Sequence, residues 1–130
     1  MKQFPYLLWN RNQISVPTTQ ELDVLLDKLT SEIKDGISQG VQLVVNDATG
    51  LLITIGSSLS HVEFYDSNGH PPVVGYLEDS TNNSELFHFF YEGEPSSVKK
   101  RSCVPIETAR EALRLYLLTG QKPTNIEWQR

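Results

Sequence analysis

Two segments with the apolar spacing of amphipathic helices, one near each end of the 130-residue chain, constrain the fold most. In the first segment, Thr18-Thr19-Gln20-Glu21 matches a capping box, in which Thr18 caps the helix and Glu21 reaches back from the first turn. The apolar residues that follow recur at steps of three and four: Leu22, Leu25, Leu26, Leu29, Ile33 and Ile37. This pattern predicts a helix over about residues 19–38 that ends before Gly40.

The second helical segment lies near the C-terminus. Pro105 suits the first helical position, and Glu107 complements the helix dipole in the first turn. The apolar stripe consists of Ile106, Ala109, Ala112, Leu113, Tyr116 and Leu117. Gly120 is a natural residue just past a helix end, and Pro123 prevents continuation. The second predicted helix therefore spans about residues 105–118.

Short β-rich runs, separated by turn-forming residues, fill the rest of the chain. They are Phe4–Trp9, Val41–Asn46, Leu51–Ile55, His61–Tyr65, Val73–Leu77, Glu85–Tyr91, Ser102–Val104 and Asn125–Trp128. Their order predicts a single α+β domain over residues 1–130, with a mostly antiparallel sheet and both helices packed on one face. Pro5 places the first strand at an edge of the sheet, which leaves a homodimer through that edge open.

Strict alternation in one of these runs predicts which side chains face the core. In His61–Tyr65, the apolar Val62 and Phe64 are expected inward, and His61, Glu63 and Tyr65 outward.

Charge is distributed unevenly along the chain. Between Lys34 and Lys99 lie 64 residues without Lys or Arg, and these contain nine of the 16 acidic residues. Several aromatic residues share the predicted strands of this region: Tyr65, Tyr76, Phe87, Phe89 and Tyr91. Acidic groups beside aromatic anchors favour a basic protein partner. The alternative interpretation is a surface that only maintains solubility, with the aromatic residues in the core.

Composition and short motifs exclude several classes. Direct nucleic-acid binding needs clustered basic residues, and the only basic run is Lys99-Lys100-Arg101. No apolar run approaches the length of a membrane span, and the first residues lack the pattern of a secretory signal. The single Cys103 cannot form an intrachain disulfide. These features predict a cytoplasmic protein that does not enter membranes.

No residue pattern predicts a catalytic, metal or cofactor site. The histidines lack metal-ligand spacing, no CxxC is present, and phosphate-loop and nucleophile-elbow motifs are absent from the sequence. The alternative is a small enzyme that uses His61, His88 or Cys103, with the cysteine paired to a histidine as nucleophile and base. A cysteine just before a helix is more typical of a small buried apolar residue.

The C-terminal segment resembles the characteristic end of the immunity protein 1 family of bacterial polymorphic toxin systems. The matching residues are Val104-Pro105, Glu107, Ala109-Arg110-Glu111-Ala112, Thr119-Gly120, Pro123 and Trp128. The resemblance also takes in the helix around Leu22–Leu29, the strand Leu51–Gly56 and Tyr91-Glu92-Gly93. It departs at Gly56-Ser57-Ser58, where the family has a glycine-rich strand end. The motif consists of structural residues, so it identifies a fold and marks no catalytic site.

The resemblance implies a non-enzymatic binder that neutralises a cognate toxin, chiefly a deaminase acting on nucleic acids or nucleotides. Substrate grooves of such toxins tend to be basic, so an acidic sheet would imitate the charge of the substrate. A non-inhibitory interaction module or chaperone-like protein is the second hypothesis. The residues expected to contact the partner are Glu63, Tyr65, Asp66, Glu78, Asp79, Tyr91, Glu92 and Glu94.

Overall fold

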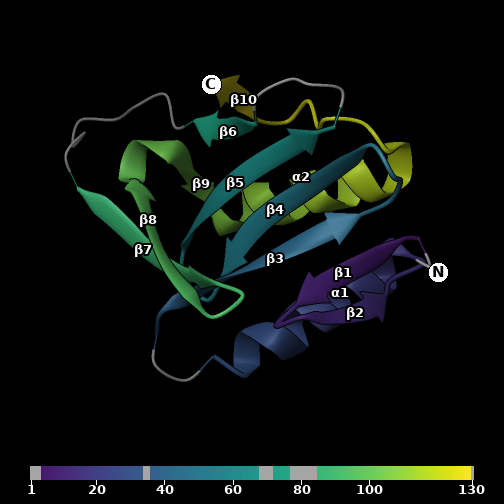
Figure 1. Ribbon diagram of the computed structural model, residues 1–130, viewed down its shortest axis with the longest axis horizontal. Helices are drawn as coiled ribbons and strands as arrows, with labels where there is room; N and C mark the ends of the chain where they lie inside the picture. Colours follow the sequence, from purple (N-terminus) through teal and green to yellow (C-terminus); the bar gives the residue numbers. More distant parts are fainter. Residues whose placement is uncertain (1–3, 34–35, 68–71, 77–84, 130) are drawn as a thin grey trace.

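A computed structural model describes residues 4–33, 36–67, 72–76 and 85–129 of the chain (Figure 1). Strands and helices follow one another in the order β1 (Tyr6–Trp9), β2 (Asn12–Ser15), α1 (Thr19–Ser31), β3 (Ser38–Val44), β4 (Thr49–Ile55), β5 (Leu59–Asp66), β6 (Val73–Tyr76), β7 (Leu86–Tyr91), β8 (Glu94–Lys99), β9 (Cys103–Pro105), α2 (Ile106–Thr119) and β10 (Glu127–Gln129). A short 3-10 turn, η1 (Lys100–Ser102), joins β8 to β9.

The strands form a mostly antiparallel sheet with the order β10-β6-β5-β4-β3-β1-β2. β3 pairs with β1 near its end and, in parallel, with β7 at its start, where Ser38 lies opposite Phe89. Toward the other edge of the sheet, β5 pairs with β9 near its start and with β6 near its end. The predicted α+β fold with a mostly antiparallel sheet and two helices is confirmed.

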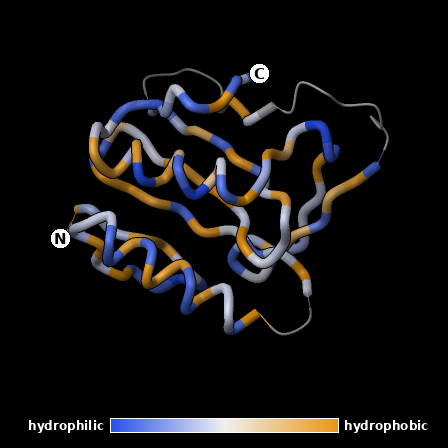
Figure 2. Tube along the Cα trace, turned by 180° about the vertical axis from the view of Figure 1, so that it is seen from behind, coloured by the Kyte–Doolittle hydropathy of each residue, from blue (hydrophilic) through white to orange (hydrophobic). Residues whose placement is uncertain are grey.

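Both helices lie on one side of the sheet, as the view from behind shows (Figure 2). Alternate residues of the central strands point toward them and form the main core with Leu22, Leu26, Leu29, Ala109, Ala112, Leu113 and Tyr116. Leu43, Leu51, Ile53 and Val62 are fully buried in this core. Each such side chain stabilises the fold by about 1.5–3 kcal/mol relative to an exposed position. Within the described residues, neither helix is long and apolar enough to cross a membrane.

The hairpin of β7 and β8 covers one end of the opposite, helix-free face of the sheet (Figure 1). It forms a second, smaller core in which Phe87, Phe89 and Cys103 are buried. Leu59, Tyr91 and Val98 pack against this cluster. The other end of the helix-free face has no such cover among the described residues, and the boundary between the two ends shapes the candidate site.

The first helix is shorter than the sequence predicted. Thr18 caps it as expected, with its hydroxyl accepting a hydrogen bond from the Glu21 amide at 3.1 Å. However, α1 ends at Ser31, not near Ser38, because β3 already begins at Ser38. Gly36 has a φ of +73°, a left-handed conformation that interrupts a helix. Strand pairing by β3 thus overrides the helical spacing that Ile37 continues.

Two strands were not predicted, and one proline has a different role. Asn10 and Arg11 form a two-residue turn with positive φ, and β2 follows directly. Because β2 pairs with β1, the expectation that the first strand lies at an edge of the sheet is wrong, and β2 is the edge strand. β8 contains Pro95 and two serines, which are poor strand formers, yet pairing with β7 holds it in the sheet. Pro105 is the cap residue of α2 and not its first helical residue.

Candidate functional site

Two glycines shape the helix-free face of the sheet. A Cβ atom on Gly40 would lie 2.8 Å from the Tyr91 ring, and one on Gly50 would lie 2.6 Å from the Gln42 amide nitrogen. Because glycine has no Cβ atom, Tyr91 can lie close over Gly40 and Gln42 close over Gly50. The Tyr91 hydroxyl donates a hydrogen bond to the Gln42 side-chain oxygen at 2.8 Å, which joins the β7–β8 hairpin to β3. This hydrogen bond fixes the positions of both side chains on the sheet face.

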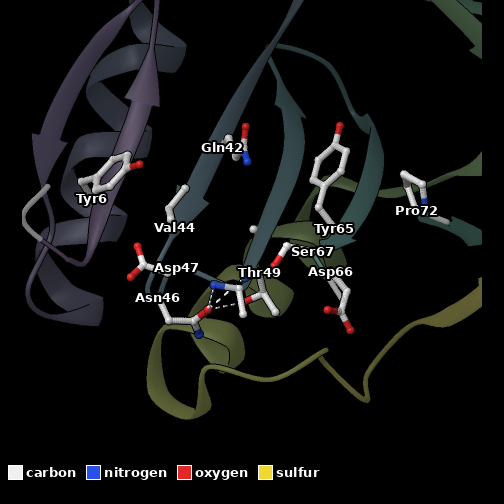
Figure 3. Close-up of a pocket in the computed structure, with 12 residues that line it drawn as sticks. Tyr6, Gln42, Val44, Asn46, Asp47, Thr49, Tyr65, Asp66, Ser67 and Pro72 are labelled. Carbon is white, nitrogen blue, oxygen red and sulfur yellow. Dashed lines mark hydrogen bonds between the residues drawn. The ribbon is translucent and has the colours of Figure 1, made fainter. Parts of the chain in front are cut away.

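Beside this contact lies an open hollow of about 400 Å³, which Figure 3 shows from close range. Its floor is formed by side chains of β1, β3 and β5, including Tyr6, Gln42 and Tyr65. Among the described residues that line it are Asp47 and Asp66, and none of these described residues is Lys or Arg. The hollow is therefore an acidic, partly aromatic surface.

The loop at one edge of the hollow is held in place by hydrogen bonds. The Asn46 side-chain oxygen accepts from the amides of Ala48 and Thr49, both at 2.9 Å (Figure 3). The Thr49 hydroxyl bonds in turn to the Tyr116 hydroxyl of α2 at 2.7 Å. The main core thus fixes the loop that carries Asp47, so this edge is preorganised.

A second cavity, the hairpin cleft, lies between β5 and the β7–β8 hairpin and has a volume of about 240 Å³. Tyr65 borders both the cleft and the open hollow, so the two hollows adjoin. At the base of the cleft, the His61 ring nitrogen Nε2 lies 3.3 Å from the Glu63 carboxylate oxygen Oε1. Phe89 covers His61, with ring centroids 5.5 Å apart. The cleft thus combines one carboxylate with aromatic walls.

Electrostatics in the cleft favour one negative charge. The neighbouring His61 side chain lowers the pKa of Glu63, although burial opposes this, and the Tyr65 hydroxyl lowers it further. Burial raises the pKa of Tyr65, as does the nearby Glu63 carboxylate. Burial also raises the pKa of Tyr91, with smaller contributions from Glu92 and Glu63. Both tyrosines therefore remain neutral hydroxyls at neutral pH, while Glu63 is ionised.

The structure brings together three of the predicted contact residues and places three more nearby. Glu63, Tyr65 and Tyr91 line the hairpin cleft, and Asp66 lies with Tyr65 in the open hollow. Glu92 and Glu94 lie at the turn of the β7–β8 hairpin. Glu78 and Asp79 lie outside the described residues.

His61 faces outward from the main core, as alternation predicted, but it does not reach solvent. Its side chain points to the helix-free face, where the β7–β8 hairpin covers it, and His61 is only 3% exposed. Alternation along a strand indicates which face a residue occupies; it does not show whether another hairpin covers that face. Among the described residues, the buried Nδ1 of His61 has no hydrogen-bond partner.

The residues of the enzyme hypothesis do not form an accessible catalytic group. His61 and Cys103 are neighbours across the β5–β9 pair, but Cys103 is fully buried. Burial raises the pKa of the Cys103 thiol to about 12, which disfavours the nucleophilic thiolate. His88 is exposed and alternates with Phe89, so it lies on the other side of the hairpin. Among the described residues, no group of His, Cys, Asp and Glu is arranged to hold a metal ion.

Sequence reasoning missed Gln42, Gly40 and Gly50 as parts of this face. The two glycines carried a usable signal, because glycine inside a strand often marks a close approach of another group. Gln42 carried none, since a polar residue in an alternating strand is the ordinary pattern for a solvent-facing position.

The C-terminal motif contains residues that fasten the two helices to each other. Arg110 of α2 donates to the Asp27 carboxylate at 2.8 Å and to the Asp23 backbone oxygen at 3.2 Å. Arg114 donates from Nε to the Asp23 carboxylate at 3.1 Å. Gly120, with a φ of +69°, ends α2. The motif is therefore structural, as its residue types predicted.

The comparison with protein families supports the resemblance seen in the sequence. The comparison with curated proteins found no match. The family model described as immunity protein Imm1 matches residues 10–130, which is nearly the whole chain. Immunity proteins bind a cognate toxin and are generally non-enzymatic inhibitors. The resemblance seen in the C-terminal motif is confirmed, and the chain belongs to the Imm1 immunity protein family.

Proposed function

We propose that this chain acts in the cytoplasm and neutralises a toxin that is a nucleic-acid or nucleotide deaminase, by covering the toxin's basic active site with the helix-free face of its sheet. The observation that carries this proposal is the charge of that face. Within the described part of the chain, the open hollow and the hairpin cleft are lined by Asp47, Glu63 and Asp66 and by no Lys or Arg. A surface of this charge complements a groove that binds phosphate-bearing substrates.

Rigid support strengthens the proposal. The main core holds the floor of the hollow from behind, and Asn46 and Thr49 fix its loop. A preorganised face loses little conformational entropy on binding, which favours high affinity. The proposed contacts are the predicted set Glu63, Tyr65, Asp66, Glu78, Asp79, Tyr91, Glu92 and Glu94, extended by Asp47 and Gln42.

Charge reversal on matched faces tests the proposal. The probe is the toxin domain encoded in the reading frame beside this gene, and the readouts are toxin activity and association rate. Asp47→Lys with Glu94→Lys changes two exposed acids of the proposed face, whereas Glu32→Lys with Glu107→Lys changes two exposed acids elsewhere. The first pair should slow association at low salt by about tenfold, and the second by less than about threefold.

The outcomes separate the possibilities. Wild-type protein that binds the toxin without reducing its activity would indicate the non-inhibitory module instead. Equal slowing by both pairs would mean that net charge alone steers association, and the proposed face would be wrong. A toxin domain without deaminase activity would refute the deaminase assignment alone.

A further inference from the structure

We infer that the hairpin cleft is a socket for a single arginine side chain of the toxin, with Glu63 as its counter-ion and Tyr65, Phe89 and Tyr91 as its walls. This inference rests on the proposed function, because it names the group that one part of the proposed face receives. The cleft lies between β5 and the β7–β8 hairpin, beside the open hollow.

The size of the cleft fits a side chain and not a larger ligand. Its volume is about 240 Å³. Pockets for drug-sized molecules and cofactors occupy about 300–1,000 Å³. The open hollow next to it would receive the surface around the inserted side chain, which is the usual arrangement of an anchor within a broader interface.

The negative charge of Glu63 makes a cationic side chain the favoured occupant of the cleft. Glu63 has a side chain that is 24% exposed, so its carboxylate is largely removed from solvent but can still be reached. Its one ion-pair partner within the described part of the chain is His61, at 3.3 Å. The neutral hydroxyls of Tyr65 and Tyr91 add no opposing charge. A partly desolvated carboxylate in such a setting gains most from a partner that brings a full positive charge.

The walls favour arginine over lysine. Phe89, Tyr65 and Tyr91 present aromatic rings around the carboxylate. A guanidinium group stacks on aromatic faces, binds a carboxylate through two parallel N–H groups and is weakly hydrated. A lysine ammonium is strongly hydrated and offers no planar fork, so it would lose more on entering the cleft.

One residue of β8 allows the cleft to be filled by substitution. Ser96 is exposed, lines the cleft and lies opposite Phe89 in the β7–β8 pair, and cross-strand partners share a face. Ser96→Trp should therefore fill the cleft. His88 is also exposed, but it lies on the other side of the hairpin and is not among the described residues that line the cleft. His88→Trp is therefore the matched control.

The experiment measures binding of the toxin domain from the adjacent reading frame to the full-length chain. Glu63→Gln keeps the shape of the side chain and removes its charge; Ser96→Trp keeps the charge and blocks the space. Each should weaken binding by about 30-fold or more, mainly through faster dissociation, because a desolvated charge pair controls the off-rate. His88→Trp should change the affinity by less than about threefold.

Substitutions in the toxin identify the inserted residue. Each toxin arginine and lysine is changed to glutamine and measured against wild-type and Glu63→Gln protein. One arginine should show coupling, meaning that its loss weakens wild-type binding strongly and Glu63→Gln binding little. Coupling to a lysine, or to no residue, would overturn the inference.

Failure of this inference differs from failure of the proposed function. If wild-type protein does not inhibit the toxin, the proposed function fails. If it inhibits, but Ser96→Trp and Glu63→Gln bind as tightly as wild type, only the socket is wrong. Should Glu63→Gln not fold, as judged by circular dichroism, the comparison of Ser96→Trp with His88→Trp decides the question alone.

Discussion

Replacing Gly40 by alanine should destabilise the protein through a single contact with Tyr91. The added Cβ would lie 2.8 Å from Cδ1 of the Tyr91 ring, closer than ordinary packing allows. The ring must move, and its hydroxyl then loses the 2.8 Å hydrogen bond to Gln42. Overpacking costs about 1–3 kcal/mol, and the hydrogen bond contributes about 1 kcal/mol.

An opposing effect has to be subtracted. Alanine restricts the unfolded chain more than glycine does, which stabilises the protein by about 0.4–1 kcal/mol where the backbone conformation allows it. Gly40 lies within β3, in a conformation open to any residue. The net loss in the free energy of unfolding should therefore be about 1–3 kcal/mol. For a domain of this size each kcal/mol lowers the Tm by about 3–5 °C.

A double-mutant cycle in urea tests this reasoning. In a Tyr91→Ala background the ring is gone, so Gly40→Ala should be neutral or slightly stabilising. The destabilisation by Gly40→Ala should thus disappear in the Tyr91→Ala background. An equal loss of stability in both would refute the contact with Tyr91 as the cause and would indicate strain in the strand itself.

Two further predictions concern titratable groups. Cys103 should not react with a thiol reagent in the native protein at pH values up to about 9, because it is buried and its thiol pKa is raised to about 12. It should react once the chain is unfolded. Rapid native labelling would contradict its burial. Glu63 has a lowered pKa in the folded state, so its ionised carboxylate stabilises the folded chain above its ordinary pKa of 4.5. This stabilisation is lost as the pH falls through the lower pKa that Glu63 has in the folded state. Urea unfolding should show a steeper loss of stability in acid for wild type than for Glu63→Gln; identical pH profiles would contradict the lowered pKa.

The sequence predicted the elements that depend on local patterns. α2 was predicted over about 105–118 and spans Ile106–Thr119, since an apolar stripe and Gly120 determine it locally. The end of α1 was wrong because the start of β3 pairs with β7, and that partner is distant in sequence. β8 was missed because EPSSVK has few strand-forming residues, and its pairing with β7 makes it a strand.

The candidate site was predictable only in part. Charge and alternation indicated Glu63 and Tyr65, and the structure places both in the hairpin cleft. The sequence held no sign that the β7–β8 hairpin folds over β5, so the burial of His61 could not be foreseen. The parallel contact of β7 with β3, which positions Tyr91 against Gly40, joins segments about fifty residues apart.

The molecule separates the residues that define its fold from those proposed to define its partner. Arg110 and Gly120 act on the helix side, where a substitution would disturb buried or capped groups. Asp47 and Glu94 are exposed, and changes at such positions usually alter stability by less than about 0.5 kcal/mol. The helix-free face can therefore vary while the frame stays constant. An immunity protein benefits from this separation, because a new toxin variant requires new contacts on an unchanged scaffold.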